Sequence, residues 1–274
     1  KDDITRNRVS NNLMVEALFD STAAAYNPFS GGVDSNIERA LIEVVRLSET
    51  ELTTFDAKFA HPEIFTLPAG PVGFVVGVEY REESFVDDRD DRLDGTITFT
   101  DYEGDVYPYV SDVVNSSPTP DNSGERDVAS LFVELQVPII ENLNAQVALR
   151  YENYGGEVGS TLDPKISAQY TINDNFSLRG SASTTFRGPT LNQLEGSNTT
   201  LSYVGAPAAF KAVDTQGNGA LAPESAVALN FGIMGEFFDD RLFTTVDFWT
   251  FDLSDPIIVE NYNAVLSAAV SVNT

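Results

Sequence analysis

The chain has 274 residues, carries a formal net charge of -26 at pH 7 and contains no cysteine. The lack of cysteine excludes disulfides, thiolate zinc sites and cysteine nucleophiles. The negative charge argues against nucleic acid as a partner, because binding phosphates requires lysine and arginine. The single histidine, His61, precedes Pro62 near a predicted turn and belongs to no catalytic motif. We therefore expect neither an enzyme nor a bound cofactor.

The first predicted elements in chain order are a weak strand at residues 13–19 and a short helix. Ser35 and Glu38 have the spacing of a capping box, in which two side chains satisfy free backbone N–H groups at a helix start. The apolar residues that follow are Ile37, Leu41, Ile42 and Val45. A short helix is therefore expected inside a first long loop at about 20–46.

Alternation of apolar and polar residues predicts that most of the remaining chain is β-strand. Between Leu143 and Glu152, for example, Leu143, Ala145, Val147, Leu149 and Tyr151 fall on one face of the segment. The predicted strands lie at about 47–66, 73–82, 129–137, 143–152, 164–172, 176–186, 226–237, 241–252 and 262–270. Together with residues 13–19 they make about ten antiparallel strands, and most of them are long enough to cross a bilayer at a tilt.

The connections between these strands alternate strictly between short and long. The short ones lie at 68–71, 138–142, 173–175 and 238–240, and the long ones at about 20–46, 83–128, 153–162 and 187–225. Short periplasmic turns and long extracellular loops are typical of outer-membrane β-barrels. The sequence therefore predicts an all-β fold, an antiparallel transmembrane β-barrel segment that lies in the cell outer membrane and contacts its lipid.

Charged residues indicate which face of each strand looks into the barrel lumen. A lysine or arginine that faces lipid at mid-membrane costs about 2–4 kcal/mol, so charged strand residues are expected on the lumen side. The residues predicted to face the lumen are Glu79, Arg81, Arg150, Lys165, Arg179 and Asp247. The residues predicted to face lipid are Val147, Leu149, Ile166, Tyr170, Val246 and Phe248. A register error of one residue would exchange the two sets.

The long loops carry the candidate binding residues. The loop at 83–128 holds 13 acidic residues and 3 arginines. We interpret it as solvated surface and predict no metal site, with divalent-cation binding as the alternative. Aromatic side chains in the loops could stack on a substrate ring, with packing inside the loops as the alternative. These aromatic residues are Tyr102, Tyr107, Tyr109, Tyr203 and Phe210.

Several segments resemble TonB-dependent outer-membrane receptors. The segment Phe65-Thr66-Leu67-Pro68-Ala69-Gly70-Pro71-Val72-Gly73 is similar to the strand and periplasmic turn of that family. The segment Phe186-Arg187-Gly188-Pro189-Thr190-Leu191-Asn192-Gln193-Leu194 resembles the family motif F-R-A-P-S-L-x-E-L, with Gly188 in place of alanine and Gln193 in place of the acid. Pro223-Glu224-Ser225 resembles the next strand entry, although Gly219 follows Asn218 where the family has proline.

The resemblance implies that residues 1–274 are part of a barrel of about 22 strands. Family members also have a plug domain and a TonB box, which we do not find in this sequence. They import a scarce large solute, such as a siderophore or other metal chelate, a cobalamin or an oligosaccharide, with energy supplied through the TonB complex. The resemblance does not identify the solute.

Two alternatives remain at this point. One is a self-contained channel or adhesin, in which residues 13–19 would pair with residues 262–270 to close a small barrel. The other is a soluble β domain that binds carbohydrate through its loop aromatics. An open sheet whose two edges lie far apart would favour the receptor over the small channel.

Overall fold

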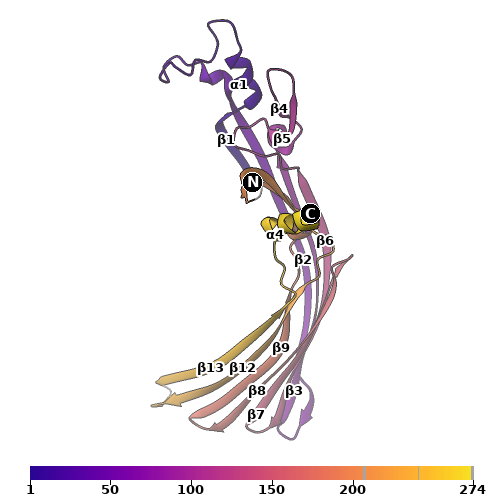
Figure 1. Cartoon of the computed structure of the whole chain (residues 1–274). Helices are drawn as coiled ribbons and strands as arrows, with labels where there is room; N and C mark the ends of the chain where they lie inside the picture. The colour runs from indigo at the N-terminus through magenta and orange to yellow at the C-terminus, as the bar shows by residue number, and fades with distance from the viewer. Residues whose placement is uncertain (206–207, 240, 273–274) are drawn as a thin grey trace.

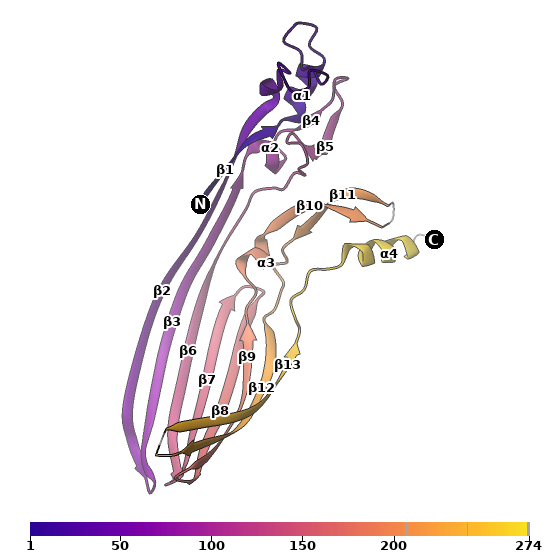
Figure 2. The same ribbon diagram turned by 90° about the vertical axis from the view of Figure 1, so that its left-hand side faces the viewer.

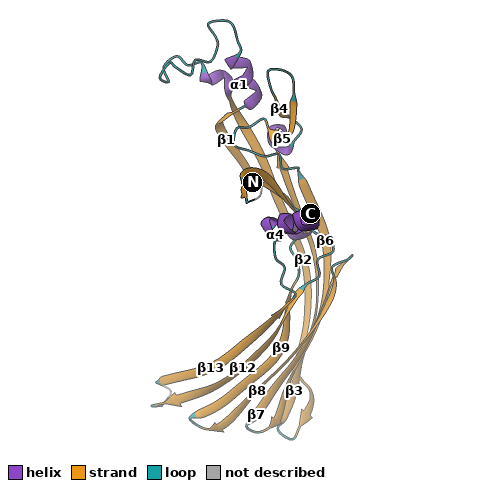
Figure 3. Cartoon of the chain, viewed as in Figure 1, coloured by secondary structure: helices purple, strands orange, loops and turns teal. Residues whose placement is uncertain are grey.

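The computed structural model of the chain describes residues 1–205, 208–239 and 241–272. Within these residues the main feature is one curved antiparallel sheet of nine strands, which we call the wall (Figure 1). The strand order is β1-β2-β3-β6-β7-β8-β9-β12-β13, so each strand pairs with the wall strands that precede and follow it in the chain. The helices and two small hairpins lie toward one end of the wall (Figure 3), which we call the loop end. The other end is the turn end.

The wall strands are β1 (Asp2–Val9), β2 (Leu41–Leu67), β3 (Gly70–Arg89), β6 (Asn122–Ile140), β7 (Leu143–Gly155), β8 (Gly159–Asn173), β9 (Phe176–Arg187), β12 (Glu224–Phe237) and β13 (Leu242–Ser254). The hairpins are β4 (Thr98–Thr100) with β5 (Val106–Ser111) and β10 (Ser197–Val204) with β11 (Ala209–Gln216). The helices are α1 (Asn11–Leu18), the 3-10 helix η1 (Ile37–Ala40), α2 (Asp91–Asp94), α3 (Leu191–Glu195) and α4 (Tyr262–Val272). No helix among the described residues is long and apolar enough to span a membrane.

Side-chain alternation gives the wall two different faces. Leu149 lies opposite Val133 and Pro164, whereas Arg150 lies opposite Phe132 and Asp163. Neighbouring side chains in a strand point to opposite faces, so the predicted separation of Leu149 from Arg150 is present in the structure. The face of Leu149 is apolar and exposed. Its members Val147, Leu149, Ile166, Tyr170, Val246 and Phe248 are 39–71% exposed, which argues against the soluble alternative.

The first strand of the wall was not predicted, and the predicted strand at 13–19 is wrong. Those residues belong largely to helix α1, where the Ser10 side chain accepts a hydrogen bond from the backbone N–H of Leu13 at 3.1 Å and so caps the helix. Strand β1 pairs with the loop end of β2, from Asp2 opposite Leu47 to Val9 opposite Leu41. The helix expected after Ser35 is only η1, because residues from Leu41 onward are already in β2.

The predicted strand at 262–270 is also wrong, because these residues form helix α4. The Asn261 side-chain oxygen accepts hydrogen bonds from the backbone N–H groups of Asn263 and Ala264, at 3.0 and 3.2 Å. Asparagine is a favoured helix N-cap, and the alanines that follow favour helix over strand. The apolar residues at 262–270 therefore indicated an ordered element correctly, but the element is a helix and not a strand.

Two of the predicted long loops are shorter than expected. Strand β3 continues to Arg89 and β6 begins at Asn122, so the loop predicted at 83–128 spans only residues 90–121. The loop predicted at 153–162 is a tight hairpin in which Gly155 pairs with Gly159. Gly155 and Gly156 have φ angles of +68° and +51°, which glycine adopts without a steric penalty, so the chain reverses within three residues. The short turns lie where predicted, although Asp240 is outside the described residues.

The wall is an open sheet. Strand β1 pairs only with β2 and strand β13 only with β12 in the described part of the chain, and these two strands form the opposite edges. The prediction that the chain does not close a barrel by itself is confirmed, but the edges are β1 and β13 rather than the two segments expected. The wall has nine strands instead of about ten. The alternative of a self-contained channel or adhesin that closes its own barrel is therefore wrong.

Gly77 shows how closely side chains pack on the wall. It lies opposite both Lys58 and Phe132, and a Cβ atom at this position would overlap the Phe132 ring. Gly77→Ala is therefore expected to displace the ring and to lower the free energy of unfolding by about 1–3 kcal/mol, measured by thermal denaturation in detergent. Gly180→Ala is the control, because its Cβ would meet only ordinary contacts of 3.6 Å or more. Equal stability of the two variants would contradict this prediction.

Candidate functional site

The polar face of the wall is its concave face. An open hollow of about 650 Å³ lies on it, lined by side chains from six neighbouring strands. One lining residue from each strand, in order from β6 to β13, is Gln136, Gln146, Lys165, Arg179, Asn230 and Asp247. Amide and charged groups that converge on one hollow can donate and accept hydrogen bonds over a large solute.

An ion pair crosses the hollow at its β9 to β13 side. Arg179 donates to Asp247 through Nη2 at 2.5 Å and through Nε at 2.9 Å, in a bidentate geometry. The two residues lie on strands that are not neighbours, with Gly232 of β12 between them. A Cβ atom at Gly232 would overlap the Asp247 carboxylate, so glycine is what allows the pair to form.

A second group of charges lies toward the loop end of the same face. Arg81 donates to Glu79 at 2.5 Å and to Glu152 at 2.8 Å. Arg150 also donates to Glu152, through Nε at 2.9 Å and Nη2 at 2.8 Å. The Glu152 side chain is only 3% exposed and accepts from both arginines, so it is the centre of this network.

Five of the six charged residues predicted to face the lumen lie in two groups, and the sixth, Lys165, lines the hollow. Glu79, Arg81 and Arg150 meet through Glu152, and Arg179 pairs with Asp247. In the sequence, these positions are recognised as charged residues that alternate with apolar residues along a strand. That signal does not predict which charges pair, because the partners come from strands distant in sequence.

Sequence reasoning missed an aromatic stretch on the polar face. Trp249 and Phe251 lie two and four residues after Asp247 in β13, so they share its face, and they are 64% and 59% exposed. Their ring centroids are 5.6 Å apart. Strand β13 has aromatic residues on both faces, which hides the alternation. The spacing from Asp247 is the signal that could have found them.

The five loop aromatics do not form one site. Tyr102 stacks on Phe19 with ring centroids 4.4 Å apart, and Tyr107 stacks on Phe99 at 5.3 Å. Tyr109 is 82% exposed on strand β5. Tyr203 and Phe210 lie opposite each other on the β10–β11 hairpin, with centroids 5.6 Å apart. The two hairpins that carry these residues are separate (Figure 2).

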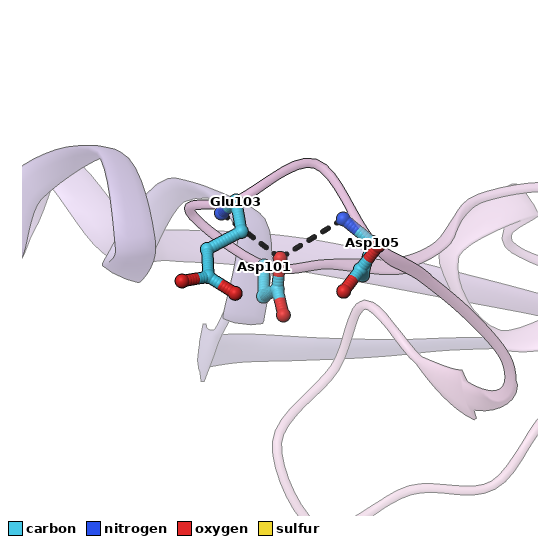
Figure 4. A group of neighbouring side chains, drawn as sticks. All are labelled: Asp101, Glu103 and Asp105. Carbon is cyan, nitrogen blue, oxygen red and sulfur yellow. Dashed lines mark hydrogen bonds between the residues drawn. The ribbon is translucent and has the colours of Figure 1, made fainter.

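Three acidic residues of the β4–β5 turn lie close together (Figure 4). The carboxylate oxygens of Asp101, Glu103 and Asp105 are within 4.8 Å of one another. Asp101 accepts hydrogen bonds from the backbone N–H of Asp105 and Glu103 and from the Tyr107 hydroxyl, at 2.9, 3.0 and 3.0 Å. These bonds, chiefly that from Asp105, hold the pKa of the Asp101 carboxyl below its usual value. They also explain the geometry as that of a tight turn, so the cluster does not by itself indicate a metal site.

An open antiparallel sheet with long strands, an apolar exposed face and a polar hollow on the other is a piece of a transmembrane β-barrel wall. The chain belongs to the family described as TonB dependent receptor-like, beta-barrel, whose model matches residues 7–272. Members of this family are outer-membrane transporters and not enzymes.

Similar proteins are siderophore receptors. A probable TonB-dependent siderophore receptor PirA of Acinetobacter baumannii is 25% identical over 154 residues, which are 55% of this chain and 20% of that protein. A mutant of the ferric enterobactin receptor PfeA of Pseudomonas aeruginosa superposes with a TM-score of 0.57 at 16% identity, over 93% of this chain and 32% of that one. The solved structure of PirA of A. baumannii superposes with a TM-score of 0.54 at 21% identity, again over 93% of this chain and 32% of that one. The chain thus spans about a fifth to a third of these relatives, and the likeness to the solved structures shows the fold.

Proposed function

We propose that this chain forms part of the wall of an active importer, which carries a scarce and large metal chelate of the siderophore class across the outer membrane. The observation that carries the proposal is the polar hollow on the concave face, opposite an exposed apolar face. In this assignment Glu79, Arg81, Arg150, Arg179 and Asp247 face the lumen, and the apolar face contacts lipid. Tyr203 and Phe210 contact the solute from the loop end, with Tyr102, Tyr107 and Tyr109 as further candidates on the β4–β5 hairpin.

The solute class rests on the relatives. Those named above are siderophore receptors, and a further similar structure, with a TM-score of 0.52 at 16% identity, holds PfeA in complex with enterobactin. A lumen wall with amide, hydroxyl and paired charged groups suits a solute with many oxygen atoms. Import against a gradient requires energy, which the TonB complex would supply by acting on a plug domain rather than on this wall.

Uptake in living cells tests this function. In cells that lack the parent receptor and grow under iron limitation, the gene that contains this chain is expected to restore uptake of radiolabelled ferric enterobactin. Uptake should disappear when TonB is also removed. Cobalamin or oligosaccharide uptake instead would identify another solute class. Restoration of none of the three, or uptake without TonB, would refute the proposal.

The assignment also fixes the orientation of the wall. We predict that the loop end is extracellular, because long connections of outer-membrane barrels face outward. Protease added to intact cells is then expected to cut within residues 90–121 or 188–223, identified by mass spectrometry of the released peptides. Residues 141–142, in a turn at the other end, are the internal control. Cleavage confined to that turn would reverse the orientation.

A further inference from the structure

The connection between β9 and β12, residues 188–223, folds inward over the concave face; we call it the β9–β12 loop. Helix α3 lies at its base, and the β10–β11 hairpin extends from there over the concave side of the wall (Figure 2). The hairpin carries Tyr203 and Phe210, which are 53% and 65% exposed. The position of this pair therefore depends on how the base of the loop is held.

Arg126 of strand β6 holds the base. Its Nη1 donates to the backbone oxygen of Pro189 at 2.6 Å, while Nε and Nη2 donate to Glu83 at 2.9 and 2.7 Å. The guanidinium also lies over the ring of Tyr154, 5.1 Å from its centroid, in a cation–π contact. The Arg126 side chain is only 13% exposed. One planar group thus joins the β9–β12 loop to β3, β6 and β7.

Apolar packing also holds the base of the β9–β12 loop. Leu194 of α3 is buried in one cluster with Val128 and Tyr154 of the wall and with Val158 of the turn between β7 and β8. The helix itself is fixed by a complete capping box, in which Thr190 and Gln193 each bond the backbone of the other. Gln193, which stands where the family motif has an acid, therefore forms one half of this capping box.

Gly188 explains the other departure from that motif. A Cβ atom at this position would lie 2.5 Å from the Tyr154 ring, closer than side chains approach. The ring that receives Arg126 thus occupies the space that the usual alanine would need. Gly188, Tyr154 and Arg126 form one interlocked contact.

Beyond this base, the β10–β11 hairpin makes few hydrogen bonds to the rest of the described chain. Thr199 donates from its backbone to Thr119 at 3.1 Å, and Ser197 donates to the Pro120 oxygen at 3.4 Å. Farther along, Asn263 and Tyr262 of α4 bond the backbone of Gly205 and Tyr203. Arg126 is the charged and largely buried residue that contacts the base of the β9–β12 loop.

We propose that Arg126 is a positioning residue, which latches the β9–β12 loop to the wall and so places Tyr203 and Phe210 over the lumen. The role of the aromatic pair rests on the proposed function, whereas the latch does not. Without Arg126, the Pro189 oxygen loses its donor and Glu83 keeps only Arg81, at 3.4 Å, so the base of the loop is held to the wall by apolar packing alone. The hairpin then samples positions away from the lumen.

A distance measurement tests the latch without any solute. The chain has no native cysteine, so spin labels can be attached at Leu201→Cys on β10 and Leu162→Cys on β8, in the full receptor with any cysteine outside this chain replaced. Both side chains are exposed. We expect the distance between the two labels to have one narrow distribution when Arg126 is present. In Arg126→Gln, we expect this distribution to become broad.

Arg89→Gln is the matched control. Arg89 is 11% exposed and donates to Asp87 through Nε and Nη2 at 3.2 and 2.7 Å, so it resembles Arg126 in burial and pairing but has no bond to the β9–β12 loop. The distribution of distances between the two labels is expected to stay narrow in Arg89→Gln. A narrow distribution in Arg126→Gln, or equal broadening in both variants, would overturn the latch.

A second variant tests the interlocked contact if Arg126→Gln fails to reach the membrane. Gly188→Ala is expected to push the Tyr154 ring away from Arg126 and to broaden the same distances. Adding Tyr154→Ser removes the ring and should relieve that clash, restoring part of the narrow distribution. No effect of Gly188→Ala would refute the coupling between these residues.

The consequence for the solute is tested separately, with ferric enterobactin as the probe. If the latched position is occupied only one time in ten after Arg126→Gln, the apparent dissociation constant rises about tenfold. The rise should shrink in the Tyr203→Ala/Phe210→Ala background, which a general loss of structure would not produce. Failure of the wild-type receptor to bind the probe would refute the proposed solute, while the distance measurement still decides the latch.

Discussion

Ile166→Arg is expected to destabilise the folded receptor by about 2–4 kcal/mol, the cost of an arginine on the lipid face at mid-membrane. Ile166 lies near the middle of β8, is 54% exposed and pairs with Val147 and Ala182 on the apolar face. Lipid offers an arginine side chain there neither water nor a counter-ion. The effect is therefore large although the site makes few contacts within the chain.

Ser167→Arg is the matched control, one residue along on the polar face. Ser167 lines the hollow, where an arginine can reach water and the oxygen of Gln146. The two variants are compared by chemical denaturation of the full receptor in lipid vesicles, with the yield of folded protein as a second readout. Equal loss in both variants, or a greater loss in Ser167→Arg, would reverse the assignment of the two faces.

The strands of the wall could be predicted because lipid on one side and polar groups on the other impose alternation. That constraint acts on segments such as 143–152, and each of them is a strand in the structure. It does not act beyond the bilayer. The loop ends of β2 and β3 pair through their backbones in water and need no apolar face, so their length was underestimated and β1 was missed.

The two helices predicted as strands show a second limit. Residues 13–19 and 262–270 are apolar without a clear period, and such runs fit either element. Capping by Ser10 and Asn261 decides in favour of helix. Asparagine and serine also occur in turns, so these caps could not be distinguished in the sequence.

The candidate site could be predicted in its composition but not in its pairing. Charges on strands were placed on one face by the cost of facing lipid. The bond between Arg179 and Asp247 depends on the register of three strands and on Gly232 between them. Arg126 and Tyr154 were missed because both were assigned to loops, whereas they lie in β6 and β7.

Glu152→Ala is expected to lower the free energy of unfolding by about 3 kcal/mol, near the lower end of the cost of breaking a buried ion pair. Glu152 is 3% exposed at its side chain and accepts three hydrogen bonds from Arg81 and Arg150. Removing it leaves two guanidinium groups close together on the concave face. Arg150 is 37% exposed, so water on the concave face replaces part of the interaction that it loses and keeps the cost below that of a fully buried pair.

Glu224→Ala is the matched control for this prediction. Glu224 also accepts two bonds from one arginine, but that partner, Arg187, is 53% exposed. Removing Glu224 is expected to cost less than removing Glu152, because water solvates the exposed Arg187 that is left without its partner. Both variants are measured by denaturation of the full receptor at the same ionic strength. High salt should reduce the effect of Glu224→Ala more than that of Glu152→Ala, because ions screen the exposed Arg187 better than the less exposed Arg81 and Arg150. Equal costs for the two variants would show that Glu152 is not the centre of the charged network and that its burial has no energetic consequence.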